Sequence, residues 1–194
     1  MIFGFETLER TNRQELSRIY DTLTPSRRVR IDRLKRQEDI DLSLLAELVA
    51  RRLLAEAGEK AALESAENGR PFLQSGGLYI SLTHSGELAA CVLDTLPVGI
   101  DAEKVRPIRS VLLGRVCTEE ELAFITEGAS SLPEVISDPA LLDRFFQVWT
   151  AKEAYFKAKG CGITDLKSVN VLTLGREVVR EGDYLMTVVR LSEK

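Results

Sequence analysis

The chain has 194 residues, of which 44% are hydrophobic and 29% charged, and its 26 basic and 30 acidic residues give a net charge of −4. This composition is typical of a globular protein and argues against a disordered chain, a collagen-like repeat or a disulfide scaffold. A nucleic-acid-binding domain normally carries a basic excess, so we expect no nucleic-acid partner. A chain of this length buries about 70% of its unfolded surface and forms one large domain or two small ones.

The small numbers of histidines and cysteines exclude several kinds of metal and redox site. His84 is the single histidine, which excludes a metal site built from several histidines, and the three cysteines lack the CxxC spacing of zinc fingers and thioredoxins. An odd cysteine count and a start without a signal-peptide pattern predict a cytoplasmic protein. The longest apolar runs are only a few residues, whereas a membrane-spanning helix needs about 20, so we expect no membrane association. Carboxylates are therefore the main candidates for holding any metal.

The first distinctive segment along the chain is basic. Residues 27–36 contain five arginines and one lysine but a single acid, Asp32. This cluster is either a solvated helix face or an anion-binding edge, because guanidinium groups match the geometry of phosphate oxygens. Leucines and a valine at spacings of three and four then predict a helix over 41–57, which Gly58 would cap.

The middle of the chain alternates as β-strands do. A turn at 68–71 precedes an alternating strand over 78–83, and residues 84–86 separate it from a returning strand over 88–93. These two segments predict a hairpin, and a further strand begins at Val98.

The second half carries two helix signals and a final hairpin. A capping box formed by Thr118 and Glu121 predicts a short helix, and a longer one is expected over 138–160 because a proline follows its capping aspartate. Strands are expected over 168–174 and 184–191. Each half thus combines helices, a glycine-marked turn and strands, which leaves an ancient duplication open.

Two acids in the strand that begins at Val98 form the first constellation. Asp101 and Glu103 are two positions apart, so a strand projects them from one face. Adjacent carboxylates repel each other unless a cation or a proton lies between them, and Mg²⁺ prefers such oxygen ligands. The alternative is a strand end that exposes both acids to water.

The segment 149–162 forms the second constellation, with Glu153 and Lys157 one helical turn apart. This spacing stabilises a surface ion pair, or it places a metal-binding or proton-accepting carboxylate beside a phosphate-binding lysine. The third is the lone His84 beside Thr83, a kind of histidine that is more often structural than catalytic. The sequence has no GxSxG, P-loop or GxGxxG motif, which argues against a serine hydrolase and the common nucleotide sites.

Taken together, four segments resemble the 4′-phosphopantetheinyl transferase superfamily, in its larger, Sfp-type branch: 68–71, 80–86, 97–103 and 149–162. The resemblance covers the chain from Leu23 to Val171. It implies an α+β fold of two similar subdomains, 1–104 and 105–194, which form an intramolecular pseudo-dimer with the active site in the cleft between them. It also implies one compact monomer, with Asp101 and Glu103 supplied by the first half and the third acid by the second.

The resemblance implies an enzyme that moves the 4′-phosphopantetheine group of coenzyme A to a serine of an acyl or peptidyl carrier protein, releasing adenosine 3′,5′-bisphosphate. Asp101, Glu103 and Glu153 match the family's ligands for Mg²⁺ or Mn²⁺. Asp101, Glu153 and Lys157 form the expected catalytic set, with Glu153 as the base for the serine proton and Lys157 on the transferred phosphate. The residues expected to contact coenzyme A are Arg27, Arg30, Arg70, Thr83, His84, Lys152 and Lys157.

By the same resemblance, the segment 106–116 is expected to contact the carrier protein; the alternative is a partly buried helix. Its apolar residues would supply grip and its arginines would meet acids on the carrier: Ile108, Arg109, Val111, Leu112, Leu113 and Arg115. The sequence departs from the family pattern at Leu42, where an arginine for the 3′-phosphate is often found, and at Thr83, which replaces a serine but keeps its hydroxyl.

Two rival functions stay open at this point. One is a catalytically silent paralogue that binds coenzyme A or a carrier protein without transfer; the loss of an acid would favour it, and all three are present. The other is a different Mg²⁺-dependent phosphotransferase or pyrophosphatase, which explains the carboxylates but not the segments 83–86 and 149–154.

Overall fold

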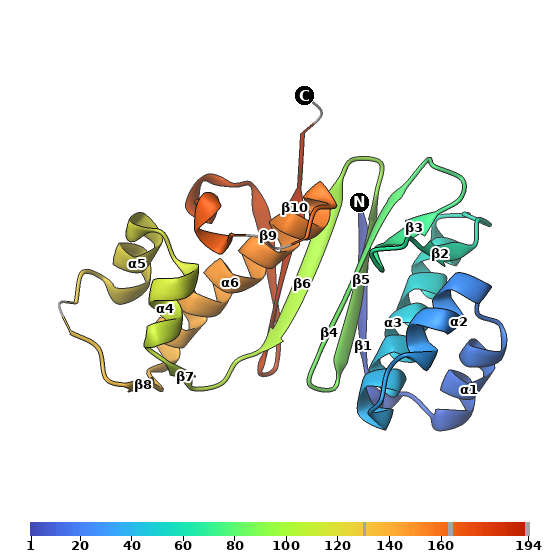
Figure 1. The fold of residues 1–194 in the computed structure, drawn as a ribbon, viewed down its shortest axis with the longest axis horizontal. Coiled ribbons are helices and arrows are strands. Elements are labelled where there is room, and N and C mark those ends of the chain that lie inside the picture. Colours follow the sequence, from blue (N-terminus) through green and yellow to red (C-terminus); the bar gives the residue numbers. More distant parts are fainter. Residues whose placement is uncertain (130, 163–164, 193–194) are drawn as a thin grey trace.

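The computed structural model describes residues 1–129, 131–162 and 165–192 and has a mixed α/β architecture. Its two main sheets are built from the strands β1 (Ile2–Thr7), β4 (Tyr79–Ser85), β5 (Leu88–Asp94), β6 (Val98–Lys104), β9 (Arg176–Glu181) and β10 (Tyr184–Arg190). The first sheet has the order β1-β5-β4 and the second β6-β10-β9, and both are antiparallel. The sheets lie side by side in the middle of the molecule, with helices on either flank (Figure 1).

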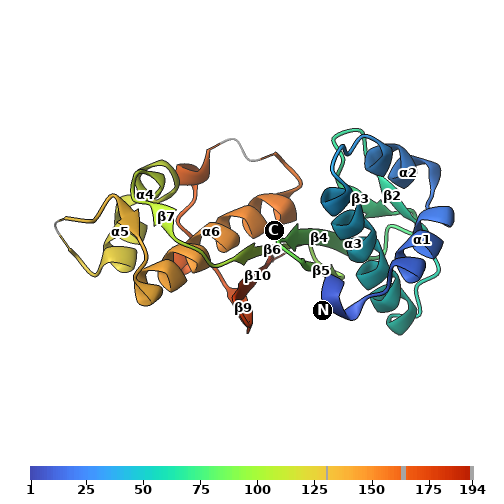
Figure 2. The same cartoon turned by 90° about the horizontal axis from the view of Figure 1, so that it is seen from below.

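The first flank holds the first three helices and a small hairpin: α1 (Arg13–Asp21), α2 (Pro25–Asp32), α3 (Gln37–Glu56), β2 (Leu63–Ser65) and β3 (Pro71–Leu73). The second holds three helices and a short strand pair: α4 (Val111–Val116), α5 (Glu119–Thr126), α6 (Pro139–Lys159), β7 (Ile108–Arg109) and β8 (Val135–Ile136). Single 3₁₀ turns are η1 (Leu8–Arg10), η2 (Leu166–Ser168) and η3 (Val171–Thr173). Figure 2 shows the two helical groups from below, with the strands between them. None of the helices among the described residues is both long and apolar enough to cross a membrane.

The capping residues predicted from the sequence begin helices α5 and α6 in the structure. Asp138 caps α6 by accepting a hydrogen bond from the Leu141 amide at 2.8 Å, and the helix ends at Gly160, whose φ of 69° suits glycine. The capping box at Thr118 and Glu121 is present at the start of α5. The hairpin of β4 and β5 is likewise confirmed.

The strand predicted over 168–174 is wrong. That segment forms η2 and η3, because the side chains of Asp165 and Asn170 accept hydrogen bonds from nearby backbone amides and turn the chain. The partner of β10 is β9, the next segment along the chain. The helix predicted over 41–57 also begins earlier, because α3 starts at Gln37.

Strand β5 joins the two halves of the core. All seven of its residues are buried. Ala89 and Cys91 pack in hydrophobic clusters with residues of α3, whereas Ala90 and Val92 pack with residues of β6 and β10. The alternation of a strand thus presents one face to a helix and the other to the second sheet.

The contact between β6 and α6 determines where the acids of β6 lie. A Cβ atom on Gly99 would collide with the backbone of Ala154 and Ala158, so only glycine allows the strand to come this close to the helix. Asp101 and Glu103 share that face of β6 and therefore point toward α6. The expected first subdomain, 1–104, includes β6. In the structure, however, the chain passes from the first sheet to the second between β5 and β6, and β6 pairs with β10 of the second half.

Candidate active site

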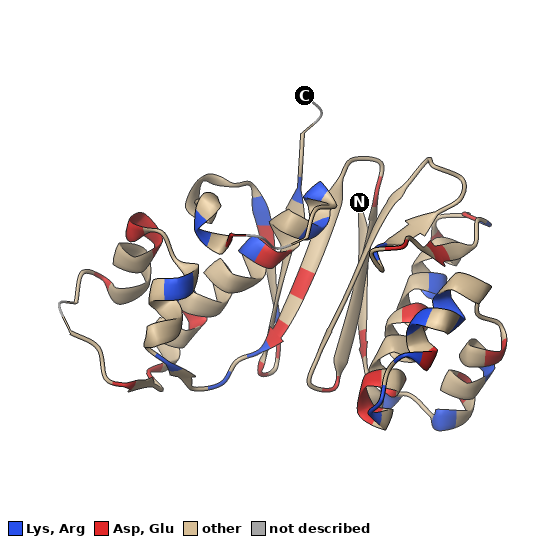
Figure 3. Ribbon diagram, viewed as in Figure 1, with Lys and Arg blue, Asp and Glu red and all other residues tan. Residues whose placement is uncertain are grey.

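A cavity of about 280 Å³ contains most of the residues singled out in the sequence. Four elements supply them: α2, β4, β6 and α6. The expected site residues that line this cavity are Arg27, Arg30, Thr83, His84, Asp101, Glu103, Glu153 and Lys157. Acidic positions on β6 and basic positions on α2 and α6 can be followed in Figure 3. The fold thus brings together residues that are up to 130 positions apart in the chain, from 27 to 157.

Asp101 accepts two side-chain hydrogen bonds in the cavity. Its Oδ1 accepts hydrogen bonds from Lys157 Nζ at 2.7 Å and from Thr83 Oγ1 at 3.1 Å. Its Oδ2 is buried and has no hydrogen-bond partner among the described residues. A buried carboxylate oxygen without a partner is costly, so this atom calls for a proton or a cation.

Burial and mutual repulsion perturb the other two acids. Burial, followed by the charge of Asp101, raises the pKa of Glu153 to about 7, although Lys157 lowers it. Burial and then Asp101 also raise the pKa of Glu103. Three carboxylates in one partly desolvated cavity therefore hold more negative charge than Lys157 alone compensates.

These carboxylates fit a divalent cation, although they do not enclose one. Among the residues that the structure describes, no three metal-ligating side chains are gathered into a closed cluster. Mg²⁺ is commonly held by one or two carboxylates and completed by waters and substrate phosphates, so an open arrangement suits it. The unpartnered Asp101 Oδ2 and the raised pKa values of Glu103 and Glu153 indicate where positive charge is needed.

The basic residues of the opposite wall of the cavity come from α2 and β4. Arg27 is almost fully buried, and its Nε and Nη1 donate to Glu47 and Ser65, both at 3.0 Å. Arg30 donates to the carbonyl of Gly69 at 2.9 Å, and burial together with Arg27 lowers its pKa. His84 reaches solvent, but partial desolvation and then Lys157 lower its pKa, so its imidazole is neutral near pH 7 unless an anion binds.

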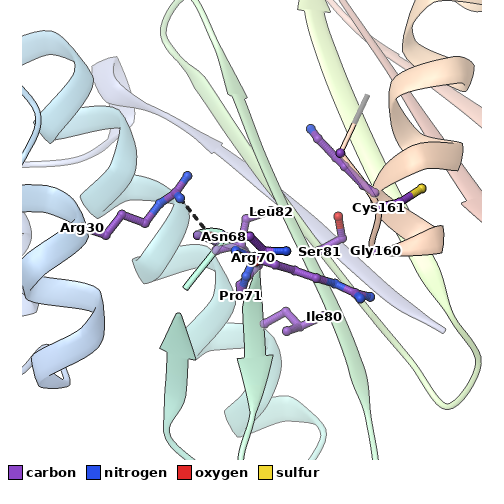
Figure 4. A pocket seen from close by; sticks show the side chains of 12 residues that line it. Arg30, Asn68, Arg70, Pro71, Ile80, Ser81, Leu82, Gly160 and Cys161 are labelled. Atoms are coloured by element: carbon purple, nitrogen blue, oxygen red, sulfur yellow. Dashed lines mark hydrogen bonds between the residues drawn. The ribbon is translucent and has the colours of Figure 1, made fainter. Parts of the chain in front are cut away.

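An adjoining cavity of about 280 Å³ extends the site toward the end of α6 (Figure 4). Arg30 and Lys157 line both cavities, and Arg70 lines the second. Arg70 lies against Gly160, where any side chain would collide with the guanidinium group. The glycine that ends α6 thereby leaves room for an arginine from the first half.

The expected role of Lys152 in binding coenzyme A is contradicted by its burial. The side chain is 0% exposed, and Nζ lies 2.7 Å from Glu121 Oε2. It also donates to the carbonyls of Leu166 and Val169, both at 2.6 Å. All three protons of the ammonium group therefore have partners inside the second half, and none is left for a phosphate.

The expected carrier-contact residues divide between core and surface. Ile108 and Leu113 belong to the hydrophobic core and Leu112 is half-buried, so the expectation that Ile108 and Leu113 grip a carrier is wrong. Arg109 is exposed and pairs with Glu134 at 3.0 Å. Val111 and Arg115 are exposed. The short strand pair of β7 and β8 buries Ile108 against the core, which the sequence pattern does not reveal.

Two residues that the sequence analysis missed also belong to the cavity region. Ser85 donates to Glu103 Oε2 at 3.0 Å, and Ser43 of α3 lines the cavity, whereas Leu42 is buried in the core. The alternation of polar residues at Ser81 and Thr83 continues to Ser85, and this pattern is the signal that points to it.

Comparisons with known proteins agree with the motifs. Residues 97–185 match the family model described as the 4′-phosphopantetheinyl transferase superfamily, which confirms the resemblance. The chain is 26% identical over 80% of its length to the 4′-phosphopantetheinyl transferase psf-1 of Bacillus pumilus, and 29% identical over 65% to the transferase gsp of Aneurinibacillus migulanus. It is 24% identical over 84% to the transferase Sfp of Bacillus subtilis. The matches cover 66%, 51% and 71% of these relatives, so the chain spans less than two thirds of the first two.

Proposed function

We propose that this chain, which belongs to the 4′-phosphopantetheinyl transferase superfamily, transfers the 4′-phosphopantetheine group of coenzyme A to a serine of an acyl or peptidyl carrier protein. The observation that carries the proposal is the cavity lined by Asp101, Glu103, Glu153 and Lys157, in which Asp101 Oδ2 has no hydrogen-bond partner from the described part of the chain. Such a site suits a bound cation and a polyphosphate together. The pseudo-dimeric arrangement with the site between two halves is part of the proposal, supported by a cavity lined from both helical groups.

The metal is proposed to be Mg²⁺, with Mn²⁺ as a substitute, held by Asp101, Glu103 and Glu153. When bound, it would neutralise charge on the pyrophosphate and favour phosphoryl transfer. Lys157 already lies 2.7 Å from Asp101, and a phosphate oxygen offers it a second acceptor in the same cavity. Lys157 is therefore proposed to hold the transferred phosphoryl group.

Glu153 is proposed as the proton acceptor. The serine oxygen of the carrier protein forms a bond to the pantetheine phosphorus, and the bond from that phosphorus to the bridging oxygen breaks. The serine proton goes to a Glu153 oxygen, and adenosine 3′,5′-bisphosphate leaves with the former bridging oxygen. Glu153 lines the same cavity as Lys157 and Asp101, which places its carboxylate beside the proposed phosphate position as a proton acceptor.

The nucleotide end of coenzyme A is assigned to the basic wall. Arg30, which lines both cavities, and Arg70, which lines the adjoining one, are proposed to meet its phosphates. His84 would gain a proton beside the 3′-phosphate, because an adjacent anion favours the imidazolium form. Arg27 has a nearly buried side chain with two nitrogens already bonded, so its role is to support this wall.

The test is a mass measurement on an apo carrier protein incubated with the chain, coenzyme A and Mg²⁺. A gain of one phosphopantetheine group that EDTA blocks and Mn²⁺ restores would support the proposal. Several carriers of the fatty acid, polyketide and nonribosomal peptide types should be compared, since the carrier is not specified by the site. Binding of coenzyme A without a mass gain on any carrier would favour a silent paralogue.

The variant Glu153→Gln keeps the shape of the side chain but removes its charge and basicity. We expect it to remain folded, as judged by circular dichroism, and to lose transfer at least about 100-fold, the lower range for a positioned acid–base group. A folded Gln variant with normal transfer would rule out this role for Glu153.

A further inference from the structure

Three hydroxyl side chains on β4 face the neighbouring edge of β6. Ser81, Thr83 and Ser85 alternate along β4 and therefore project from the same side of the strand. Their oxygens accept hydrogen bonds from the backbone amides of Ile100, Ala102 and Lys104, each at 3.2 Å. The two sheets are joined here through side chains rather than through a backbone ladder.

This junction provides hydrogen-bond acceptors for the edge of β6 that faces β4. Among the described residues β10 is the one strand that pairs with β6, so amides on the other edge of β6 need acceptors from elsewhere. Each β4 hydroxyl provides one. A hydroxyl group has a single proton to donate, and the amide that approaches its oxygen restricts where that proton can point.

Two of the three hydroxyls direct this proton to an acid of the proposed metal site. Thr83 Oγ1 donates to Asp101 Oδ1 at 3.1 Å, and Ser85 Oγ donates to Glu103 Oε2 at 3.0 Å. Ser81 occupies the equivalent place one step earlier and bonds to no acid among the described residues. The junction therefore contains two hydroxyls that hold acids and one that does not.

Each of these two hydroxyls anchors one oxygen of a carboxylate. On each acid the hydroxyl bonds to one oxygen, which a cation also approaches: Lys157 at Asp101 Oδ1 and Arg106 at Glu103 Oε2. Asp101 Oδ2 is buried and has no hydrogen-bond partner among the described residues. Anchoring one oxygen limits rotation of the carboxylate plane. The second oxygen of each acid is thus left for a cation, in an orientation that the strand pairing has already set.

We propose that Thr83 and Ser85 are positioning residues that orient Asp101 and Glu103 toward the metal, and that they do so through hydroxyls fixed by β6 backbone amides. This inference deepens the proposed function and rests on it. It also changes the expected role of Thr83, because a hydroxyl proton that Asp101 accepts is not free for the 3′-phosphate of coenzyme A. His84, the next residue along β4, remains for that contact.

The test measures metal binding as well as transfer. Mn²⁺ affinity is determined by calorimetry or electron paramagnetic resonance, with Mn²⁺ alone and with Mn²⁺ plus saturating coenzyme A. We expect Thr83→Val and Ser85→Ala to weaken Mn²⁺ affinity by roughly 10- to 100-fold, as loss of a supporting hydrogen bond to a ligand typically does. Thr83→Ser, which keeps the hydroxyl, should restore the affinity of the wild type.

Ser81→Ala is the matched control, since it removes the same kind of amide bond without touching an acid. We expect it to lower the melting temperature about as much as Ser85→Ala but to change Mn²⁺ affinity less than about threefold. If Ser81→Ala and Ser85→Ala weakened Mn²⁺ affinity equally, the inference would be overturned, because the hydroxyls would then only stabilise the contact between β4 and β6. Unchanged Mn²⁺ affinity in folded Ser85→Ala would also overturn it. Should Thr83→Val fail to fold, Ser85→Ala and Thr83→Ser still decide the outcome.

Failure of the inference and failure of the proposed function give different results. If the wild-type chain binds Mn²⁺ with the expected variant pattern but modifies no carrier, the positioning role stands and the transferase activity does not. If the wild type modifies a carrier and the hydroxyl variants bind Mn²⁺ normally, the activity stands and the positioning role is refuted. A wild type that neither binds Mn²⁺ nor modifies a carrier overturns both.

Discussion

Replacing Lys152 tests whether this residue stabilises the fold through a buried ion pair or contacts coenzyme A. Its ammonium group and the Glu121 carboxylate are both 0% exposed and lie 2.7 Å apart. Lys152→Met keeps most of the side-chain volume but leaves the Glu121 charge and the carbonyls of Leu166 and Val169 without this partner. Breaking a buried ion pair in this way costs about 3–5 kcal/mol of unfolding free energy.

That loss is a large fraction of the whole stability of a domain, which is about 5–15 kcal/mol. The assay is urea unfolding followed by circular dichroism, with Lys157→Met as the matched control. Lys157 is 31% exposed and its partner Asp101 5% exposed, whereas both members of the Lys152 pair are fully buried, so replacing Lys157 should cost less unfolding free energy than replacing Lys152. Transfer activity should show the opposite order, with Lys157→Met much more impaired per folded molecule than Lys152→Met.

A double variant tests the pairing itself. Glu121→Gln removes the buried negative charge, so combining it with Lys152→Met should cost less than the two separate losses added together. The difference should be at least about 1 kcal/mol, because neither single variant leaves a compensated charge. If Lys152→Met unfolds like the wild type and instead raises the KM for coenzyme A many-fold, Lys152 is a ligand contact and the burial argument fails.

Three further predictions follow from the packing and charges of the site. Gly99→Ala should lower the unfolding free energy by about 1–3 kcal/mol through collision with α6. Gly114→Ala, at an exposed position of α4, should be neutral or stabilising, and equal effects would contradict the close approach. Burial raises the pKa of Glu153 to about 7, above its unfolded value, so the metal-free protein loses stability as pH rises from about 4.5 to 8; Glu153→Gln should flatten this part of the profile of melting temperature against pH, and an unchanged slope would refute the raised pKa. Cys161 is exposed and lines the cavity beside Arg70, so saturating coenzyme A should slow its alkylation at least several-fold, and full reactivity in the presence of bound coenzyme A would move the ligand elsewhere.

The sequence by itself predicts those features that depend on residues close together in the chain. Strand alternation placed Asp101 and Glu103 on one face, and helical spacing placed Glu153 one turn before Lys157, and the structure has both arrangements. Capping chemistry likewise predicted α5 and α6, since caps involve residues within one turn of each other. The resemblance to the superfamily rests on these same short segments.

Lys152 shows where local reasoning was incomplete. Lys152 shares its helix face with the buried residues Phe145, Val148 and Phe156, at spacings of three and four. The helical periodicity of the sequence therefore already predicts that Lys152 is buried. Periodicity does not predict its partner, because Glu121 comes from another helix. The false strand at 168–174 has a related cause: alternation of apolar residues suits a strand, but side-chain hydrogen bonds within the segment favour turns.

The junction between β4 and β6 was decided by the tertiary structure alone. The sequence shows Ser81, Thr83 and Ser85 as an alternating polar row, which is compatible with any solvent-facing strand. Only the approach of an unpaired strand edge turns these hydroxyls into acceptors for β6 amides and donors to Asp101 and Glu103. Composition and charge limited the metal ligands to carboxylates. The orientation of those carboxylates depends on contacts between strands that are 19 residues apart in the chain, and no local pattern encodes such contacts.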